Sequence, residues 1–304
     1  MLGKLDGVPL AMLGCDEREV RLAEALGELG ADLRLVGFPK TERLMGARHF
    51  TDPRDAVRGA WAVIAPMSNT DAEGWITARE DGQRERISLS ELIPLLPGET
   101  PLFLGVAKPL IRALATRQGL ILVEMAEIDE IAVLNSIPTA EGAIAVAMEN
   151  TAFTIHNSRC LVLGLGRCGT TLARFLLGLG AKVTIASRSP ADLARAITLN
   201  CEPLKLSALE SRTDFQILFN TIPAMVLPRS YLELLDSTSV IVDIASGPGG
   251  TDFASAEELG LRAIHALSLP GKVAPQTAAD ILVQTIPHLL KNLLGEEQQD
   301  VSEG

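Results

Sequence analysis

The sequence predicts an α/β protein made of two doubly wound parallel-sheet domains with an interdomain cleft. Its 304 residues are enough for two domains of ordinary size, each with its own core. Short apolar runs alternate with segments of helical periodicity, which is typical of open parallel sheets. A glycine-rich turn joins one such run to a helix near the middle of the chain. We expect a substrate domain over 1–134, a nucleotide-binding domain over 135–276, and a helix over 277–294 that returns to the first domain.

The N-terminal half contains the strands of the first predicted sheet. They are expected at 8–13, 33–38, 61–65, 102–106 and 120–125. Polar residues follow three of these strands: Asp16, the pair Ser68 and Asn69, and Lys108. Because ligands of open α/β sheets bind beyond the carboxyl ends of the strands, these residues are candidates for substrate binding. The alternatives are that Asp16 caps a helix, that Ser68 and Asn69 form an ordinary turn, and that Lys108 is solvated.

The segment 135–142, which joins the two halves, is predicted to begin a helix. Ser136 is expected to cap that helix, and Pro138 fits its first turn, where a missing N–H costs nothing. The free N–H groups of the capped end are a candidate site for a substrate carboxylate.

Glu141 is the candidate carboxylate of the same segment. It shares a predicted apolar face with Ile137 and Ile144, where a buried carboxylate must be paired or functional. The alternative is a first-turn glutamate that the helix dipole favours.

The stretch 160–189 predicts a Rossmann-like dinucleotide site. Its turn consists of Gly164, Leu165, Gly166, Arg167, Cys168 and Gly169, between an apolar strand and an amphipathic helix. The first glycine allows a tight turn, the second lets the backbone approach a pyrophosphate, and the third lets the helix pack closely on the strand. A purely structural βαβ turn is the alternative, which the strand–turn–helix context makes less favoured.

The residues after the next strand indicate which dinucleotide is bound. An NAD site usually carries an acidic residue about twenty residues beyond the glycines, to hold the ribose 2′-hydroxyl. This chain has Ser187, Arg188 and Ser189 there, and a guanidinium beside two hydroxyls suits a 2′-phosphate. NADP is therefore favoured over NAD, with a solvated arginine next to a helix-capping serine as the alternative.

Two further loops are expected to leave the carboxyl edge of the same sheet. The first contains Asn220, Thr221, Ile222 and Pro223, and the second contains Ala245 and Ser246. Both are predicted to reach the nicotinamide half of the cofactor, where Asn220 offers its amide. Lys272 lies in a predicted loop over 269–277, and the acidic tail over 295–304 is expected to be disordered.

Composition excludes several other classes of protein. A formal charge of −11 argues against broad nucleic-acid binding. The four cysteines and four histidines show no metal spacing, so no metal site is predicted. The single tyrosine, Tyr231, has no lysine four residues later, which excludes a short-chain dehydrogenase. Because no leader and no apolar run of membrane-spanning length is apparent, we expect a cytoplasmic protein.

Five blocks of sequence together resemble the A subunit of dipicolinate synthase. They lie at 135–142, 154–156, 219–224, 248–253 and 269–275, in the order of that family. Cys15 and Cys168 depart from the residues that are commoner there. The resemblance implies a two-domain dehydrogenase that oxidises dihydrodipicolinate to dipicolinate in the mother cell of sporulating bacteria. It also implies that the partner is the flavoprotein-like B subunit of dipicolinate synthase, and we expect a homo-oligomer.

The implied reaction transfers a hydride from a dihydropyridine ring to NADP and releases a proton. Because the product carries two carboxylates, the site should present cations or N–H groups to both. Lys108, Lys272 and the helix start at Ser136 are the candidates, with Ser68, Asn69 and Thr139 as neutral donors. Glu141 is a candidate base if it lies inward with a raised pKa. The alternatives are another two-domain NADP-dependent dehydrogenase, acting on a 2-oxo acid, an amino acid or a shikimate-like ring, and a non-catalytic NADP sensor.

Overall fold

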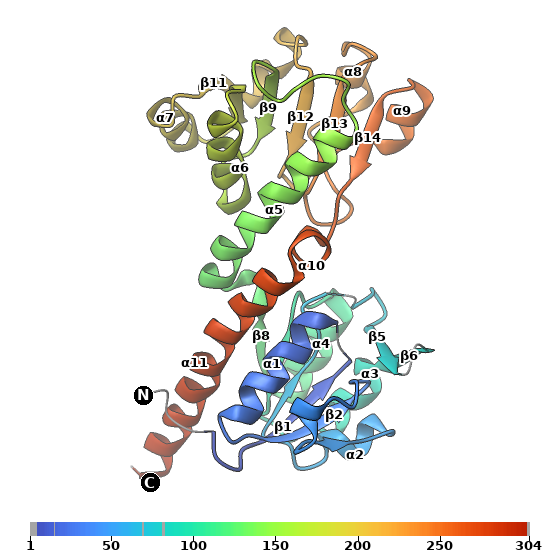
Figure 1. Cartoon of the computed structure of the whole chain (residues 1–304), viewed down its shortest axis with the longest axis vertical. Helices are drawn as coiled ribbons and strands as arrows, with labels where there is room; N and C mark the ends of the chain where they lie inside the picture. The colour runs from blue at the N-terminus through green and yellow to red at the C-terminus, as the bar shows by residue number, and fades with distance from the viewer. Residues whose placement is uncertain (1–4, 15, 69, 81–82, 303–304) are drawn as a thin grey trace. The chain divides into compact units, whose positions relative to one another are not determined.

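The computed structural model describes residues 5–14, 16–68, 70–80 and 83–302, in two compact units. Unit 1 comprises Met1–Ala132 with Pro275–Gly304, and unit 2 comprises Val133–Ala274 (Figure 1). Each unit contains one six-stranded sheet in which all neighbouring strands run parallel. The prediction of two doubly wound α/β domains is confirmed.

Unit 1 has the sheet order β3-β2-β1-β4-β7-β8. Its strands are β1 (Pro9–Leu13), β2 (Asp32–Val36), β3 (Arg48–His49), β4 (Ala62–Ile64), β7 (Pro101–Leu104) and β8 (Ile121–Glu124). Its helices are α1 (Glu17–Glu28), α2 (Pro53–Val57), α3 (Leu89–Leu92), α4 (Pro109–Gln118) and α11 (Pro275–Ser302), with 3-10 turns η1 (Glu42–Leu44), η2 (Ile93–Leu95) and η3 (Met125–Glu127). The central strands are apolar on both faces because helices cover both, which is why they read as continuous apolar runs.

A hairpin that the sequence analysis did not predict extends unit 1. It pairs β5 (Trp75–Glu80) with β6 (Gln83–Ser88) in antiparallel register. Ile76 lies opposite Ile87, and both side chains are buried in the core of the unit. The base of the hairpin is thereby attached to the sheet domain.

The C-terminal helix α11 completes unit 1. It packs along α1 (Figure 1), and Arg21 forms an ion pair with Asp280 at 2.9 Å. The apolar face of α1 and the inward face of α11 are both buried. α11 continues to Ser302, past the residue Leu294 at which the sequence analysis ended this helix.

Unit 2 has the sheet order β11-β10-β9-β12-β13-β14. Its strands are β9 (Arg159–Leu163), β10 (Lys182–Ser187), β11 (Glu202–Lys205), β12 (Ile217–Asn220), β13 (Val240–Asp243) and β14 (Arg262–His265). Its helices are α5 (Asp129–Glu149), α6 (Arg167–Gly178), α7 (Pro190–Thr198), α8 (Arg229–Leu232), α9 (Phe253–Glu258) and α10 (Leu269–Val273), with the 3-10 turn η4 (Leu206–Ser211). Cys160 and Val162 pack into one core and Leu161 and Leu163 into another, so both faces of the sheet are covered.

The helix α5 begins earlier than the sequence analysis predicted. It starts at Asp129, so Ser136 does not cap it and Pro138 lies inside it. The acidic residues Asp129 and Glu130 favour a helix start there because they complement the helix dipole. The expectation of a capped helix end at Ser136 is therefore wrong.

The buried face of α5 also differs from the predicted one. It is a stripe of small residues, Ser136, Ala140, Ala143 and Ala147, together with Ile144. Ile137 is 41% exposed and Glu141 is exposed as well, so these two do not share a buried stripe. The earlier helix start and the small residues, which allow close packing, explain the change.

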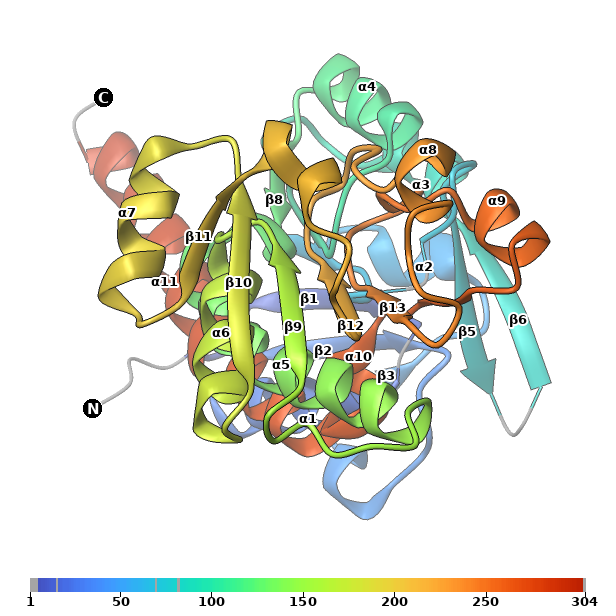
Figure 2. The same ribbon diagram turned by 90° about the horizontal axis from the view of Figure 1, so that it is seen from above.

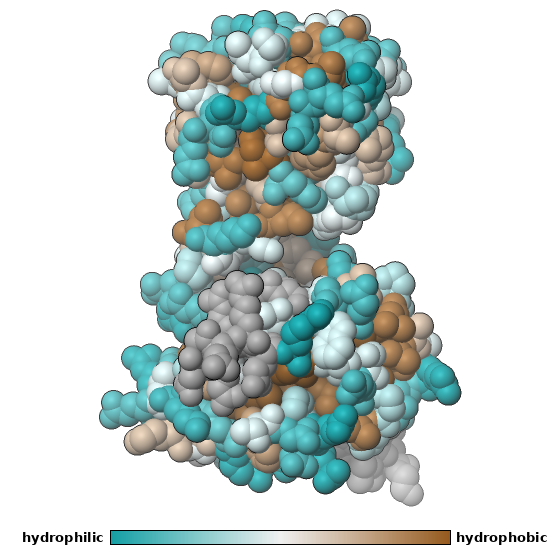
Figure 3. All heavy atoms as spheres, turned by 90° about the vertical axis from the view of Figure 1, so that its right-hand side faces the viewer, coloured by the Kyte–Doolittle hydropathy of each residue, from teal (hydrophilic) through white to brown (hydrophobic). Residues whose placement is uncertain are grey.

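α5 has the length and apolar composition that would suffice to cross a membrane, and 44% of that apolar window is buried inside the protein. One helix of this kind is weak evidence for a membrane span, because its length and composition alone meet the criterion. On the face drawn in Figure 3, polar residues alternate with apolar ones over the surface of both units.

Candidate functional site

The turn between β9 and α6 has the geometry of a dinucleotide-binding turn. Gly164 has a φ of +89°, and a β-carbon there would lie 2.6 Å from Oγ1 of Thr221. A β-carbon on Gly169 would lie 2.2 Å from the carbonyl oxygen of Gly164, so α6 can approach the strand only because this residue is glycine. At Gly166, by contrast, a β-carbon would meet no atom within 4 Å. The backbone is therefore open to a ligand at Gly166.

The start of α6 is suited to an anion. Gly166 occupies the N-cap position and no side chain caps the helix. No acidic residue lies in the first turn, so the N–H groups of Arg167, Cys168 and Gly169 meet no carboxylate of that turn. Burial raises the pKa of the Cys168 thiol, and this thiol is therefore neutral beside the turn. An uncapped helix start next to an open glycine fits the pyrophosphate of a dinucleotide.

At the end of β10, Ser187 and Ser189 serve the local fold. Ser187 is buried and donates its hydroxyl hydrogen to Asp192 at 2.9 Å, while its Oγ accepts from the N–H of Ser189 at 3.1 Å. Ser189 caps α7 by accepting from the N–H of Asp192. Arg188 is exposed at this end of the strand. The hydroxyl of Ser187 is therefore used within the β10–α7 turn, whereas Ser189 acts there as an acceptor, and its contact with a phosphate stays a prediction.

Asn220 is a structural residue of the loop after β12. Its side chain is fully buried, and Nδ2 donates to the carbonyl of Ile222 at 3.0 Å while Oδ1 accepts from the N–H of the same residue. The prediction that this amide faces the cofactor is therefore wrong. Thr221 donates to the carbonyl of Leu163 at 2.8 Å and lies beneath Gly164, whereas Pro223 is exposed.

Asp243, which the sequence analysis did not single out, organises the loop after β13. Its carboxylate is fully buried and accepts hydrogen bonds from the N–H groups of Ala245 and Gly250 and from the hydroxyl of Thr251. Ala245 is buried in this loop and Ser246 is exposed. An aspartate directly after three apolar strand residues is the sequence signal by which Asp243 could have been found, because a buried carboxylate in that position needs donors.

The order of the central strands places these turns at one edge of the unit 2 sheet. β10, β9, β12 and β13 lie side by side (Figure 2) and run in the same direction. The carboxyl ends of all four therefore share that edge, which is where open α/β sheets bind ligands. The glycine turn, Arg188, Thr221 and Ser246 are brought together there.

In unit 1 the structure brings Asp16 and Ser68 together through a residue that the sequence analysis missed. Arg18 donates from Nε to Asp16 Oδ1 at 3.0 Å and from Nη2 to Ser68 Oγ at 2.6 Å. Asp16 also caps α1 by accepting from the N–H of Arg18 at 2.9 Å, which is the alternative role that the sequence allowed, and its part in substrate binding stays a prediction. Asn69 and Cys15 lie outside the described residues.

Glu19 is the second residue of this cluster that was missed. It is 2% exposed and accepts from the N–H groups of Asp16 and Met67, both at 2.9 Å. Burial raises the pKa of Glu19 to about 7, the negative charge of Asp16 adds to this, and the charge of Arg18 opposes it. The ion pair with Arg18 and the hydrogen bonds hold the pKa of Asp16 below its ordinary value, although burial opposes them. The sequence hint was a capping box, Asp16 with Glu19 three residues later.

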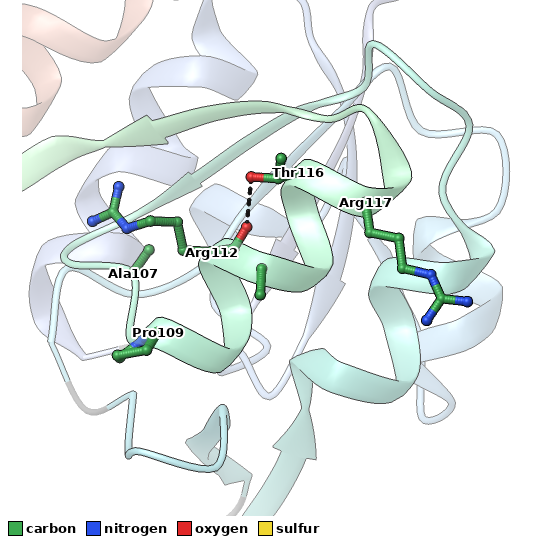
Figure 4. A pocket seen from close by; sticks show the side chains of 6 residues that line it. Ala107, Pro109, Arg112, Thr116 and Arg117 are labelled. Carbon is green, nitrogen blue, oxygen red and sulfur yellow. Dashed lines mark hydrogen bonds between the residues drawn. The ribbon is translucent and has the colours of Figure 1, made fainter.

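Lys108 occupies the N-cap position of α4 and is partly exposed. The surface hollow drawn in Figure 4 is lined by the next residues of this helix, and the side chains of Arg112 and Arg117 point away from each other. Arg112 forms an ion pair with Glu124 at 2.5 Å. These arginines therefore do not converge on one ligand.

The remaining candidates in unit 2 are corrected by their surroundings. The hydroxyl of Ser136 lies 2.6 Å from the carbonyl oxygen of Val133, to which it can donate, and 2.6 Å from the hydroxyl of Thr171, with which it forms a hydrogen bond. Thr139 donates to the carbonyl of Asn135 at 2.7 Å. Neither hydroxyl is a free donor. Glu141 is exposed, so the argument for a buried base fails.

Lys272 is exposed on α10, where the sequence analysis expected a loop. The helix accommodates Pro270 in its first turn, which explains why a proline-containing stretch is helical.

Comparisons with known proteins agree with this two-unit architecture. Residues 9–126 match the family model of the N-terminal domain of the dipicolinate synthase A subunit. Residues 138–250 match the model of the D-isomer specific 2-hydroxyacid dehydrogenase, NAD binding domain. A shorter similarity to alanine dehydrogenase 2 of Staphylococcus aureus (strain USA300) has 31% identity over 108 residues, which is 32% of this chain and 29% of the relative.

Similarity at 35–36% identity over almost the whole chain is found to A subunits of dipicolinate synthase. The chain is 36% identical over 295 residues to the dipicolinate synthase A subunit of Bacillus subtilis (strain 168), covering 96% of this chain and 99% of the relative. The crystal structure of the dipicolinate synthase A subunit from Bacillus halodurans has a TM-score of 0.87 at 35% identity, over 96% of this chain and 99% of that chain. The crystal structure of the corresponding chain from Bacillus subtilis gives the same TM-score, 0.87, at 36% identity, over 97% and 99% of the two chains.

Proposed function

Because the chain belongs to the family of the dipicolinate synthase A subunit, we propose that it oxidises dihydrodipicolinate to dipicolinate with NADP as the hydride acceptor. The chain is a nicotinamide-dinucleotide-dependent oxidoreductase, as its NAD-binding domain indicates. We also propose that its partner is the flavoprotein-like B subunit of that enzyme. The chain is expected to form a homo-oligomer and to be located in the cytoplasm of the mother cell of sporulating bacteria.

The observation that carries the proposal is the turn between β9 and α6. Gly166 leaves its backbone open, and the helix start beside it carries no side-chain cap. When bound, the cofactor supplies a hydride acceptor, and the substrate ring becomes aromatic by losing one hydride and one proton. The protein therefore has to bind and orient two ligands rather than stabilise a high-energy intermediate.

The preference for NADP rests on Arg188. It is the exposed cation at the end of β10, where NAD enzymes carry an acidic residue. The nearest carboxylate on α7, Asp192, is turned toward Ser187 and Arg195 by hydrogen bonds of 2.9 and 3.1 Å. An acidic side chain held in this way is not offered to a ribose 2′-hydroxyl, and Arg188 suits a 2′-phosphate.

Calorimetric titration of the full chain with NADPH and NADH tests the cofactor. Wild-type protein should prefer NADPH, and the Arg188→Ala variant should lose about 10- to 100-fold in NADPH affinity with NADH binding unchanged, as expected for a charge-assisted hydrogen bond. Arg174→Ala, which removes another exposed arginine of unit 2, is the matched control. A preference for NADH would contradict the assignment of NADP.

The substrate is tested by repeating the titration with dipicolinate and by measuring NADPH formation from dihydrodipicolinate. Dipicolinate should tighten NADPH binding if both ligands share one site. Lys108→Ala and Lys272→Ala are each expected to weaken substrate use and to leave NADPH binding intact, because a lysine can pair with a carboxylate. Turnover of a 2-oxo acid or an amino acid instead would favour the alternative dehydrogenases. NADPH binding without turnover, even with the B subunit present, would favour a sensor.

A further inference from the structure

Arg18 is a buried cation at the carboxyl edge of the unit 1 sheet. It is 5% exposed, and its Nε and Nη2 donate to the carboxylate oxygens of Asp16. A charged group is placed in such a position only at a cost in free energy, and the helix cap itself requires only Asp16 and Glu19. The capping interactions of α1 therefore do not account for the guanidinium.

The contact between Arg18 and Ser68 sets the direction of the serine hydroxyl. Nη2 of Arg18 lies 2.6 Å from Ser68 Oγ, and arginine has no acceptor, so Oγ must accept this hydrogen bond. The hydroxyl hydrogen of Ser68 then has to be donated elsewhere. In the part of the chain that the structure describes, no acceptor for it is found, and Ser68 is partly exposed. A donor polarised by a buried cation is thus presented toward the surface.

The loop that carries Ser68 is held in place from two sides. The N–H of Met67 donates to Glu19 Oε1 at 2.9 Å, which attaches the loop to α1. On the other side, a β-carbon on Gly105 would lie 1.8 Å from the carbonyl oxygen of Met67, so this loop packs directly on the backbone that follows β7. A donor on a loop fixed in this way loses little conformational entropy when a ligand binds.

We infer that Arg18 and Ser68 form a carboxylate-binding subsite, in which the hydroxyl of Ser68 donates to one carboxylate of the substrate and Arg18 positions and polarises that hydroxyl. The inference rests on the proposed function, because it names the group that binds half of the dicarboxylate. Asp16 balances the charge of Arg18, and both oxygens of Glu19 are occupied by backbone N–H groups. Arg18 is accordingly a positioning residue and Ser68 is the binding residue.

The test measures binding of dipicolinate and of pyridine-2-carboxylate, which has a single carboxylate, to the full chain saturated with NADPH. Ser68→Ala should weaken dipicolinate binding about tenfold, as for one lost hydrogen bond to a charged group. The preference for the dicarboxylate over the monocarboxylate should fall with it, whereas Ser68→Thr, which keeps a hydroxyl, should restore most of that preference. The matched control is Thr116→Ala, because this hydroxyl of unit 1 donates to the backbone carbonyl of Arg112 in its own helix.

Arg18→Lys tests the positioning role, because lysine keeps the charge and loses the fork that joins Asp16 to Ser68. The double variant Arg18→Lys/Ser68→Ala should bind dipicolinate no more weakly than Arg18→Lys alone. If Ser68→Ala leaves the dicarboxylate preference unchanged in a wild-type background that binds dipicolinate, the subsite is refuted and the proposed function stands. If the wild-type chain does not bind dipicolinate, both are refuted.

Discussion

The hydroxyl oxygen of Thr221 lies 2.6 Å from the position that a β-carbon on Gly164 would occupy. The same hydroxyl donates to the carbonyl of Leu163, the last residue of β9. Position 164 therefore requires glycine for two reasons: the side chain of Thr221 leaves no space for a β-carbon, and the backbone is left-handed. Gly166, two residues later, has neither restriction.

This contrast predicts different outcomes for two glycine substitutions. Gly164→Ala should destabilise the protein by about 1–3 kcal/mol, because it combines a strained φ with a steric clash. Gly166→Ala should leave thermal stability unchanged and weaken NADPH binding at least tenfold, because its methyl group enters the space of the pyrophosphate. Thermal unfolding and calorimetry separate the two effects. Unaltered NADPH affinity in Gly166→Ala would show that the cofactor does not approach this turn.

Asp243→Asn is expected to loosen the loop after β13. The carboxylate accepts three hydrogen bonds, and an amide nitrogen in place of one oxygen would face a donor in the buried interior. The cost should be about 1–3 kcal/mol, with a lower melting temperature and weaker NADPH binding. Asp236→Asn, at an exposed turn of the same unit, is the control. Equal melting temperatures for the two variants would contradict the role given to Asp243.

Asn220→Ala is expected to lower stability by a similar amount. It removes both hydrogen bonds to the backbone of Ile222 and leaves an N–H and a carbonyl without their partner. Because Asn220 is buried away from ligands, NADPH affinity should change less than in Gly166→Ala when both are measured below the melting transition. If Asn220→Ala were fully stable but failed to bind NADPH, this result would support the prediction that the amide contacts the cofactor.

Glu19 predicts a pH dependence of stability. Its pKa is raised from 4.5 to about 7 in the folded protein, so the folded state binds more protons than the unfolded state between these values. The free energy of unfolding should therefore fall as pH rises from about 4.5 through 7, by about 1–3 kcal/mol from this group, and should level off above the raised pKa, once Glu19 is ionised in both states.

Chemical unfolding of wild type, Glu19→Gln and the control Glu17→Gln across this range measures the effect. Glu17→Gln, at an exposed residue of the same helix turn, should keep the wild-type slope of stability against pH. Glu19→Gln should flatten that slope, whatever its absolute stability. An unchanged slope in Glu19→Gln would show that this carboxyl titrates normally in the fold.

The sequence predicted the elements that depend on local pattern. The strand, glycine turn and helix over Leu161–Leu179 follow from residues within a few positions of one another, and so does the alternation of strands and helices. The family resemblance is confirmed by similarity over almost the whole chain. The start of α5 was missed because its acidic first turn competed with a serine–proline pair that is equally typical of a helix start.

The sites were harder to predict because side-chain partners come from distant segments. Arg18 contacts Ser68, fifty positions away, as well as Asp16, and Asn220 resembles a ligand contact until its bonds to Ile222 are seen. Ser187 likewise looked available for a phosphate because its bond to Asp192 depends on how the β10–α7 turn folds. Loop residues at a sheet edge serve ligands or the loop itself, and sequence pattern alone does not separate the two roles.

The packing of α11 on α1 imposes an order on synthesis. The chain leaves unit 1 after Ala132, makes all of unit 2, and returns to unit 1 at Pro275. During synthesis on the ribosome, the apolar face of α1 therefore lacks its partner helix α11 until unit 2 has been translated. The nucleotide-binding unit is encoded without interruption and can fold first, whereas the other unit becomes complete only after the segment that forms α11 has been translated.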